Sequence, residues 1–373
     1  MTIVVIIFVL IIVLHLAKHG NRNINGALLA KKEIVDMHVH VAGVGAGNSG
    51  CHVSDKLRRN WRYKTYLRAF GVTETDLRHH GDAVVFKNIS ERINRSKSIK
   101  AAVVLALDGV IDKHDNLDLR KTETYVPNEF VARETEKYSN LLFGASVNPY
   151  RPDAIRRLEQ VADRGAVLIK WLPAIQHIDP ADERLIPFYK KMAELGLPLL
   201  THAGGERSFT TAEASLGDPQ KLHLPLSHGV TVIAAHAATT GKSDGEDNML
   251  RLLRMFPQYP NLYTDISSLT QANKLRFLSK LVRQDVHDRL VYGTDFPLIN
   301  TPLVSAWYYF RELSMKQMWR ISRERCCWDR DVLLKSALSV PDHVFTTWDS
   351  IPAGKVTGDE CSSHVHALPV REG

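Results

Sequence analysis

Eight short apolar runs, separated by stretches with helical periodicity, constrain the fold of this chain more than any other feature of its sequence. The runs are rich in β-branched residues and continuously apolar, which is typical of strands buried on both faces of a parallel sheet. They cover residues 34–38, 101–107, 141–147, 167–171, 198–202, 230–236, 262–265 and 290–292. Amphipathic stretches such as 153–164, 184–195 and 271–283 connect consecutive runs, as the crossover of a βαβ unit would.

Eight such units within about 260 residues predict an α/β fold, specifically a (β/α)₈ TIM barrel. An open doubly wound sheet is the alternative. It is disfavoured because the glycines after the first run, Gly43, Gly45 and Gly47, do not form the Gly-x-Gly-x-x-Gly turn of dinucleotide-binding sheets. With 373 residues, 44% of them hydrophobic and 24% charged, the chain has an ordinary globular composition.

A long insert separates the first two predicted strands. It spans residues 41–100 and contains two helix-like segments, 61–70 and 82–93. A segment that follows a strand lies at the C-terminal face, where barrels keep their active sites, so we expect the insert to contribute to a substrate pocket. The predicted organisation is an N-terminal anchor or signal-like segment at 1–18, a basic linker at 19–32, the barrel at 33–340 and a weakly ordered polar tail at 341–373.

The N-terminal segment contains an apolar run at residues 2–17, in which His15 is the one strongly polar residue. As a helix the run would span about 24 Å, which is short of the roughly 30 Å hydrocarbon core. No charge precedes it and no good cleavage site follows, so an uncleaved anchor is favoured over a removed signal peptide. Because Lys18 and Arg22 follow the run, the positive-inside rule predicts a membrane-anchored protein whose catalytic domain is cytoplasmic.

Charge and cysteine content narrow the classes of partner. The 48 Lys and Arg residues exceed the 41 Asp and Glu residues by a modest margin that is spread along the chain, giving a net charge of +7. This favours a solvated surface over a nucleic-acid site. The four cysteines are too few and too scattered for a disulfide framework. The 17 histidines stand out, because histidine is the commonest metal ligand and general base.

Ligand-type side chains stand at the ends of the predicted strands. His38 and His40 lie two residues apart on the first strand, so alternation places them on the same side. Because strand ends meet at one mouth of a barrel, residues far apart in sequence converge there. The full set is His38, His40, Lys170, His202, His236 and Asp295, with Glu206, Asp108 and the segment 148–150 as further pocket candidates.

This set resembles the amidohydrolase superfamily of metal-dependent barrels, and within it the amidohydrolase-2 branch. The resemblance covers about residues 33–300 and rests on Asp36-x-His38-x-His40, Thr201-His202-Ala203-Gly204, Ala235-His236, Tyr263-x-Asp265 and Tyr292-Gly293-Thr294-Asp295-Phe296-Pro297. It implies that His38, His40, His202 and Asp295 bind one divalent metal ion, with zinc as the expected ion. It also implies that His236 lies beside the metal-bound water as an acid–base group or as a ligand of a second ion.

Lys170 has more than one interpretation. Its context is similar to that of dihydroorotase-like relatives, in which a carboxylated lysine bridges two metals and the strand-five and strand-six histidines hold the second ion. Alternatively, Lys170 is an ammonium group that binds a substrate carboxylate, or a buried lysine paired with an acid. Because the amidohydrolase-2 branch usually has a mononuclear site, we expect one ion, with two as the alternative.

The resemblance implies an enzyme that hydrolyses a small carbonyl compound, such as an amide, ester or lactone, with a metal-activated water. A divalent ion lowers the pKa of its bound water to about 7. Asp295 can then take a proton from that water, and His236 can stabilise the developing oxyanion or act as a base. A metal-dependent non-oxidative decarboxylase of a small carboxylic acid is the alternative. A non-catalytic membrane-anchored binding module is a second one, disfavoured because no expected ligand is missing. Expected partners are a small-molecule substrate, the membrane and a second copy of the chain, with no nucleic acid.

Overall fold

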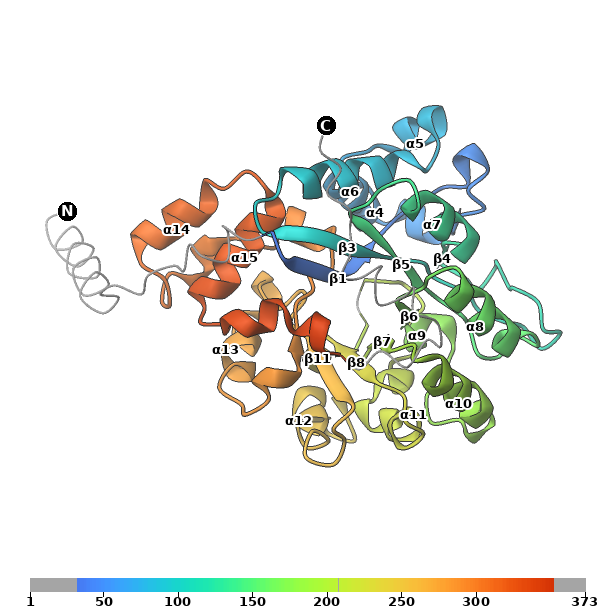
Figure 1. Cartoon of the computed structure of the whole chain (residues 1–373). Helices are drawn as coiled ribbons and strands as arrows, with labels where there is room; N and C mark the ends of the chain where they lie inside the picture. Colours follow the sequence, from blue (N-terminus) through green and yellow to red (C-terminus); the bar gives the residue numbers. More distant parts are fainter. Residues whose placement is uncertain (1–31, 207, 352–373) are drawn as a thin grey trace, which may run out of the picture.

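The computed structural model describes residues 32–206 and 208–351, and its centre is one sheet of eight parallel strands surrounded by helices (Figure 1). The strands pair in chain order, each with the next. After the last strand, Phe296 forms a parallel bridge with Val39 of the first, and His40 N donates to Phe296 O at 2.9 Å. This contact brings the two edges together, so the predicted TIM barrel is confirmed. The strands are β1 (Ile34–His40), β3 (Ile99–Leu105), β5 (Leu141–Ala145), β6 (Leu168–Trp171), β7 (Leu199–His202), β8 (Val232–Ala235), β11 (Leu262–Asp265) and β12 (Leu290–Val291).

Helices connect the strands on the outside of the barrel (Figure 1). They are α7 (Asn128–Thr135), α8 (Ala154–Asp163), α9 (Pro173–Gln176), α10 (Ile186–Leu195), α11 (His223–Ser227), α12 (Asn248–Leu253), α13 (Phe277–Leu281), α14 (Met315–Ser322) and α15 (Cys327–Ala337). Two short antiparallel pairs lie outside the barrel sheet: β2 (His52–Val53) with β4 (Thr124–Tyr125), and β9 (Lys242–Ser243) with β10 (Glu246–Asp247).

The insert after β1 folds into four helices: α3 (Asp55–Arg59), α4 (Trp61–Phe70), α5 (Glu74–His80) and α6 (Val84–Arg95). Helix α4 has the bounds expected from its sequence, because Asn60 caps its start by accepting from Arg62 N. Its end is set by Gly71, whose φ of 80° is accessible to glycine at little cost.

Side-chain alternation along the strands builds the barrel interior in layers. Leu168, Leu200 and Tyr263 belong to the apolar cluster inside the barrel. Two residues further along the same strands, and therefore on the same face, are Lys170, His202 and Asp265. The strands thus place an apolar layer below a polar layer at their C-terminal ends, which is the end where barrels hold active sites.

Strand β1 also directs polar side chains to the barrel mouth, but it does so through a bulge. Val35 and Met37 belong to the interior cluster, so strict alternation would turn His38 and His40 away from it. The pairing of β1 with β3 shifts register between Asp36 and Val39. This bulge reverses the alternation, and both histidines line the cavity at the barrel mouth.

The packed domain ends later than the expected boundary at residue 340. Residues 341–373 were predicted to form a weakly ordered tail, but Asp342–Phe345 and Thr347–Ser350 form 3₁₀ turns. Val344 and Phe345 are buried, and Ile351 packs against the cluster inside the barrel. The packed domain therefore extends at least to residue 351 rather than ending at 340. Residues 352–373 lie outside the described residues.

The predicted membrane-anchored localisation requires a correction. Among residues 32–206 and 208–351, none of the helices is long and apolar enough to cross a bilayer. We therefore withdraw that localisation and the membrane partner. The segment at 1–18 on which it rested, and most of the linker at 19–32, lie outside the described residues.

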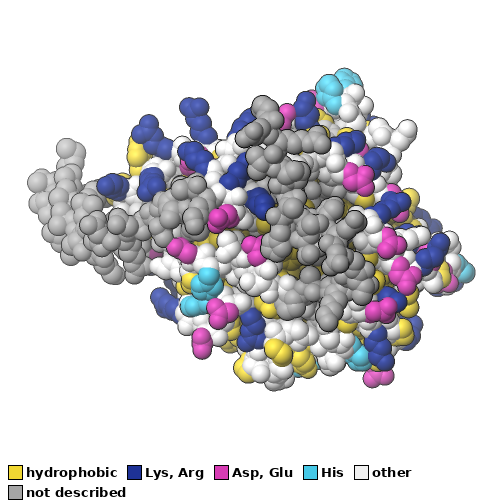
Figure 2. All heavy atoms as spheres, in the orientation of Figure 1, with side chains coloured by type: hydrophobic (Ala, Val, Ile, Leu, Met, Phe, Trp, Pro, Cys, Tyr) yellow, Lys and Arg dark blue, Asp and Glu magenta, His cyan; other side chains and the backbone are white. Residues whose placement is uncertain are grey.

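Charged side chains are mixed on the molecular surface. On the face shown in Figure 2, Lys and Arg side chains alternate with Asp and Glu side chains over the described residues. Pairs such as Arg156 with Asp153 and Arg78 with Glu74 bring opposite charges together at the surface. Such exposed pairs contribute little to stability, but they neutralise the modest positive excess locally.

Candidate metal centre

Three metal-ligating atoms meet at the floor of the barrel mouth. His38 Nε2 lies 3.2 Å from His40 Nε2. Asp295 Oδ1 lies 3.1 Å from His40 Nε2 and 3.7 Å from His38 Nε2. Ligand bonds of about 2.1 Å place the ligand atoms about 3.0 to 3.4 Å apart around a four- or six-coordinate ion. Two of the three separations fall in this range and the third, between Asp295 Oδ1 and His38 Nε2, is slightly longer, so the three atoms lie close to the spacing that a single divalent ion requires.

Asp265 fixes the orientation of His38 from behind. Its Oδ2 lies 2.7 Å from His38 Nδ1, and both side chains are fully buried. A carboxylate can only accept here, so the neutral imidazole carries its proton on Nδ1 and turns the lone pair of Nε2 to the cavity. Asp265 belongs to a second group of three donors, with His38 and His236. The 2.7 Å separation is that of a hydrogen bond, which favours an orienting role.

Asp36 holds the segment that carries Asp295 in place. Its carboxylate accepts from Thr294 N at 3.0 Å, Thr294 Oγ1 at 2.5 Å and Trp328 Nε1 at 2.7 Å. Burial raises the pKa of Asp36 to about 6 despite these hydrogen bonds. Asp295 is the next residue after Thr294. Its φ is 59°, a conformation that is uncommon for non-glycine residues and recurs at functional sites. The strand that carries His38 is thereby tied to the residue before Asp295.

His236 stands beside the three-atom group without joining it. Its ring stacks on that of His38 with 5.2 Å between centroids, and its Nε2 lies 3.8 Å from Asp295 Oδ2. Its Nδ1 is 2.8 Å from Ser267 Oγ. Like Asp295, His236 has a positive φ, here 56°. The predicted acid–base residue is therefore next to the predicted ligand carboxylate.

His202 shares the cavity but is less closely placed. Its ring centroid lies 5.3 Å from that of His236, and its Nδ1 is 3.6 Å from Glu206 Oε2. It belongs to neither of the two donor groups found among the described residues. Its Nε2 is buried and has no hydrogen-bond partner in the described chain. A buried nitrogen without a partner is costly, and a bound ion would satisfy it.

Lys170 lies beside the same group. Its Nζ lies 3.0 Å from His38 Nε2, and the side chain is fully buried. No carboxylate of residues 32–206 or 208–351 lies within ion-pair distance of it. The structure thus disfavours the interpretation of Lys170 as a buried lysine paired with an acid, because its closest described polar contact is with the predicted ligand His38.

The electrostatics of the site favour ligand-competent protonation states. Burial lowers the pKa of His38 to about 4, and the neighbouring Lys170 adds to the shift. Burial also lowers the pKa of His202, and that of His236 to well below its ordinary value. For Lys170, burial lowers the pKa to about 8. Burial alone raises the pKa of Asp295, but the histidines outweigh it and hold it well below the usual range. Neutral imidazoles and an ionised carboxylate are the forms that bind metals.

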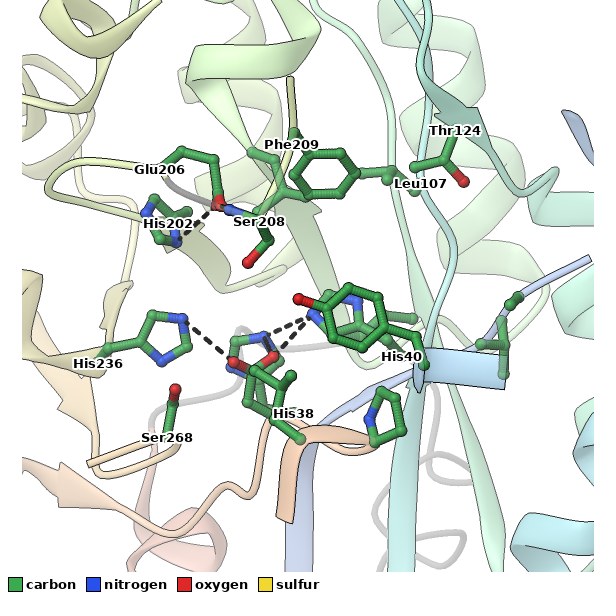
Figure 3. Close-up of a pocket in the computed structure, with 18 of the residues that line it drawn as sticks. His38, His40, Leu107, Thr124, His202, Glu206, Ser208, Phe209, His236 and Ser268 are labelled. Carbon is green, nitrogen blue, oxygen red and sulfur yellow. Dashed lines mark hydrogen bonds and ion pairs between the residues drawn. The ribbon is translucent and has the colours of Figure 1, made fainter. Parts of the chain in front are cut away.

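A cavity of about 210 Å³ opens above these residues. In Figure 3, His38, His40, His236 and Ser268 lie along one side of it, with Glu206, Ser208 and Phe209 across from them. Its walls are mainly apolar and come partly from the insert, as expected; they include Leu57, Tyr63, Leu67, Phe70, Leu107, Val126, Leu172 and Leu298. Of the further pocket candidates, Glu206 lines the cavity. Asp108 and the segment 148–150 do not: Asp108 is paired with Arg151 at 2.6 Å, and Asn148 donates to Gly109 O.

Comparison with known proteins agrees with this architecture. Residues 35–316 match the family model described as Amidohydrolase, of the amidohydrolase-2 group. An uncharacterized TIM-barrel protein from Bordetella bronchiseptica is similar in structure, with a TM-score of 0.50 and 16% identity, covering 82% of this chain and 99% of the other. No protein in a search of curated sequences matches significantly.

Two further solved structures are less similar. One is a provisionally assigned 2-pyrone-4,6-dicarboxylic acid hydrolase from Pseudomonas putida, with a TM-score of 0.44, 14% identity, and coverage of 82% of this chain and 98% of that one. The other is a 5-carboxyvanillate decarboxylase from Novosphingobium aromaticivorans with bound manganese, with a TM-score of 0.44, 11% identity, and coverage of 86% and 98%.

Proposed function

The chain belongs to the amidohydrolase family, and from this premise we propose that it is a metal-dependent hydrolase of a small carbonyl compound such as an amide, ester or lactone. The family is metal-dependent and its members are enzymes, both hydrolases and decarboxylases. The observation that carries the proposal is the meeting of His38, His40 and Asp295 at the floor of the barrel cavity, with donor atoms 3.1–3.7 Å apart.

These three residues would hold the ion, with His202 as the fourth ligand. The orphaned Nε2 of His202 supports that role. A divalent ion bound there would supply Lewis-acid activation of water and of a carbonyl oxygen. We propose zinc, because two or three imidazoles and one carboxylate are a common zinc donor set, although other first-row ions accept the same ligands.

The chain's own residues provide proton transfer. Asp295 faces His38 and His40 with Oδ1, which leaves Oδ2 as an acceptor for the proton of an attacking water. His236 Nε2 lies 3.8 Å from that oxygen. The neutral imidazole can accept the proton from Oδ2, and once protonated it can donate a hydrogen bond to a developing oxyanion. The apolar walls exclude bulk water and so strengthen both interactions.

We propose one ion rather than two. Around Asp295 the described residues offer a single set of donor atoms, those of His38, His40 and Asp295, and His202 would complete the shell of that one ion. Lys170 then acts as an unmodified lysine whose Nζ lies 3.0 Å from His38 Nε2. With one ion, a Lys170 variant should keep its metal. With two ions bridged by a carboxylated Lys170, the variant should lose metal.

A non-oxidative decarboxylase is the second candidate. It is favoured by two buried lysines, Lys170 and Lys274, that lack a carboxylate within ion-pair distance among the described residues. A carboxylic acid substrate would provide that counter-charge. The apolar walls would in turn destabilise the carboxylate and so favour C–C cleavage, in which neutral carbon dioxide leaves, the electron pair stays on the substrate carbon, and a proton donated by a group such as protonated His236 replaces the lost carboxylate.

The test is a substrate panel with the purified chain, loaded with Zn²⁺ or Mn²⁺. Amides, esters and lactones report hydrolysis through acid release, and small carboxylic acids report decarboxylation through carbon dioxide release. Turnover of the first group that disappears in Asp295→Asn would support the hydrolase. Carbon dioxide release without hydrolysis would replace it with the decarboxylase, and no turnover of either group would contradict both.

A further inference from the structure

The cavity contains a buried cation that the proposed hydrolysis does not use. Lys274 stands at the end of a 3₁₀ turn, Ala272–Lys274, after β11, and its side chain lines the cavity while only 7% of the residue is exposed. Burying an ammonium group without a partner is expensive. Such a group inside a binding cavity therefore needs a counter-charge from the protein or from a ligand.

The protein supplies no such partner at contact distance. None of the carboxylates among residues 32–206 and 208–351 forms an ion pair with Lys274. The two acids that line the cavity have other contacts. Asp295 faces His40 and His38, and Glu206 accepts from Ser208 N at 2.5 Å while facing His202.

Ser268 completes a pair of donors with Lys274. Its Oγ accepts from Lys274 Nζ at 3.2 Å and from Gln271 Nε2 at 2.6 Å. Both lone pairs of the hydroxyl are thereby used, so its own hydrogen is left to donate. Ser268 lines the cavity and has a φ of 61°, a conformation uncommon for serine.

The backbone holds this pair in position. Ala272 N donates to Leu303 O at 2.8 Å, and Lys274 N donates to Gln271 O at 2.8 Å. Gln271 forms an antiparallel bridge with Val304. The turn is therefore anchored on a neighbouring segment, which keeps the ammonium and the hydroxyl at the cavity wall. In Figure 3 the Ser268 hydroxyl lies on the same side of the cavity as His236.

We infer that Lys274 and Ser268 form an anion site that binds a carboxylate of the substrate, so that the substrate is a small carbonyl compound that also carries a carboxylate on an apolar body. The ammonium supplies charge and the hydroxyl supplies a second hydrogen bond, which suits the two oxygens of a carboxylate. The apolar walls, with Phe70 and Phe209 among them, suit the remainder of the molecule.

Electrostatics agree with this geometry. Burial lowers the pKa of Lys274, and the more distant Asp295, Glu206 and Asp265 oppose the shift. A metal ion bound to Asp295 would neutralise part of the negative charge that raises the pKa of Lys274. A substrate carboxylate beside Lys274 would supply negative charge in its place. The inference rests on the proposed function, since it places the anion site in the same cavity, but it concerns binding and is testable without turnover.

The test compares two probes of the same shape, benzoate and benzamide, by calorimetric titration of the full-length, metal-loaded chain. We expect benzoate to bind wild type at least about tenfold more tightly than benzamide, as one desolvated charge-assisted contact would give. Lys274→Met should remove that preference, Lys274→Arg should retain part of it, and Ser268→Ala should weaken benzoate binding by about threefold to tenfold. Lys280→Met, which removes an exposed lysine of α13, should change neither affinity.

Metal content measured on the same samples separates this inference from the proposed function. If the chain holds no ion, the proposed function fails, and the benzoate preference can still be measured in the metal-free protein. If the ion is bound but benzoate binds wild type and Lys274→Met equally, or benzamide binds wild type as tightly as benzoate, the anion site is refuted. Ser268→Ala, which keeps the lysine, decides the matter in the same way if Lys274→Met does not fold.

Discussion

Replacing Asp265 by asparagine should weaken metal binding although Asp265 itself is not proposed as a ligand. Its two oxygens have separate tasks. Oδ1 accepts from His236 N at 2.8 Å, Ser267 N at 3.1 Å and Ser267 Oγ at 2.5 Å, and Oδ2 accepts from His38 Nδ1 at 2.7 Å. The three donors on Oδ1 require an acceptor, so the amide of Asp265→Asn must place its oxygen there and its NH₂ group against His38.

The consequence is a change of tautomer. An NH₂ group can only donate, so His38 Nδ1 would have to accept, and the imidazole proton would move to Nε2. Nε2 is the atom that faces His40 and Asp295, and once protonated it has no lone pair for an ion. Loss of a partner that orients a ligand histidine typically costs about 10- to 100-fold in metal affinity, or about 1.4–2.7 kcal/mol.

The assay is competition for Zn²⁺ or Mn²⁺ against a chromophoric chelator, with thermal unfolding recorded on the same protein. Asp329→Asn is the matched control, since Asp329 is equally buried and accepts from Ser96 Oγ and Ser98 Oγ, both at 2.6 Å, with no contact to the metal group. We expect the control to lower the melting temperature and leave metal affinity unchanged. Wild-type metal affinity in a folded Asp265→Asn variant would refute the reasoning.

Three further outcomes follow from the site and the core. Lys170→Met should keep one ion per chain and lower turnover, as elemental analysis and initial rates can show; two ions in wild type, with fewer in the variant, would establish the bridged form instead. His236→Asn should retain the ion and lose about 10²- to 10⁴-fold in turnover, and an unchanged rate would exclude it as an acid–base group. Leu200→Ala, inside the barrel, should lower the free energy of unfolding in urea by about 2–5 kcal/mol, whereas Leu250→Ala, 40% exposed on α12, should change it by at most about 0.5 kcal/mol.

The barrel could be predicted because its strands are buried on both faces. Continuous β-branched runs mark such strands, and the run at 262–265 coincides with β11. Ligand candidates could be predicted because parallel strand ends share one mouth. The direction in which the His38 and His40 side chains point could not be predicted, since it depends on a bulge in β1 that has no recognisable signal in the sequence. The role of Asp265 was also missed, because its place at a strand end does not reveal that its carboxylate hydrogen-bonds His38 Nδ1.

Lys274 was missed for a related reason. The stretch 271–283 has helical periodicity, which places a lysine on a solvated face, but the helix begins only at Phe277. The residues before it form a 3₁₀ turn that directs Lys274 into the cavity. The packed C-terminal turns were likewise hidden, because Val344 and Phe345 are too few apolar residues to signal burial in a polar segment.

The metal content of the purified chain tests the central claim most directly. Elemental analysis of wild type, His38→Ala and Asp295→Ala after reconstitution with Zn²⁺ or Mn²⁺ and removal of free ions should give about one divalent ion per chain in wild type and far less in both variants. Wild-type protein without a stoichiometric ion, or alanine variants that retain it, would contradict the assignment of His38, His40 and Asp295 as its ligands.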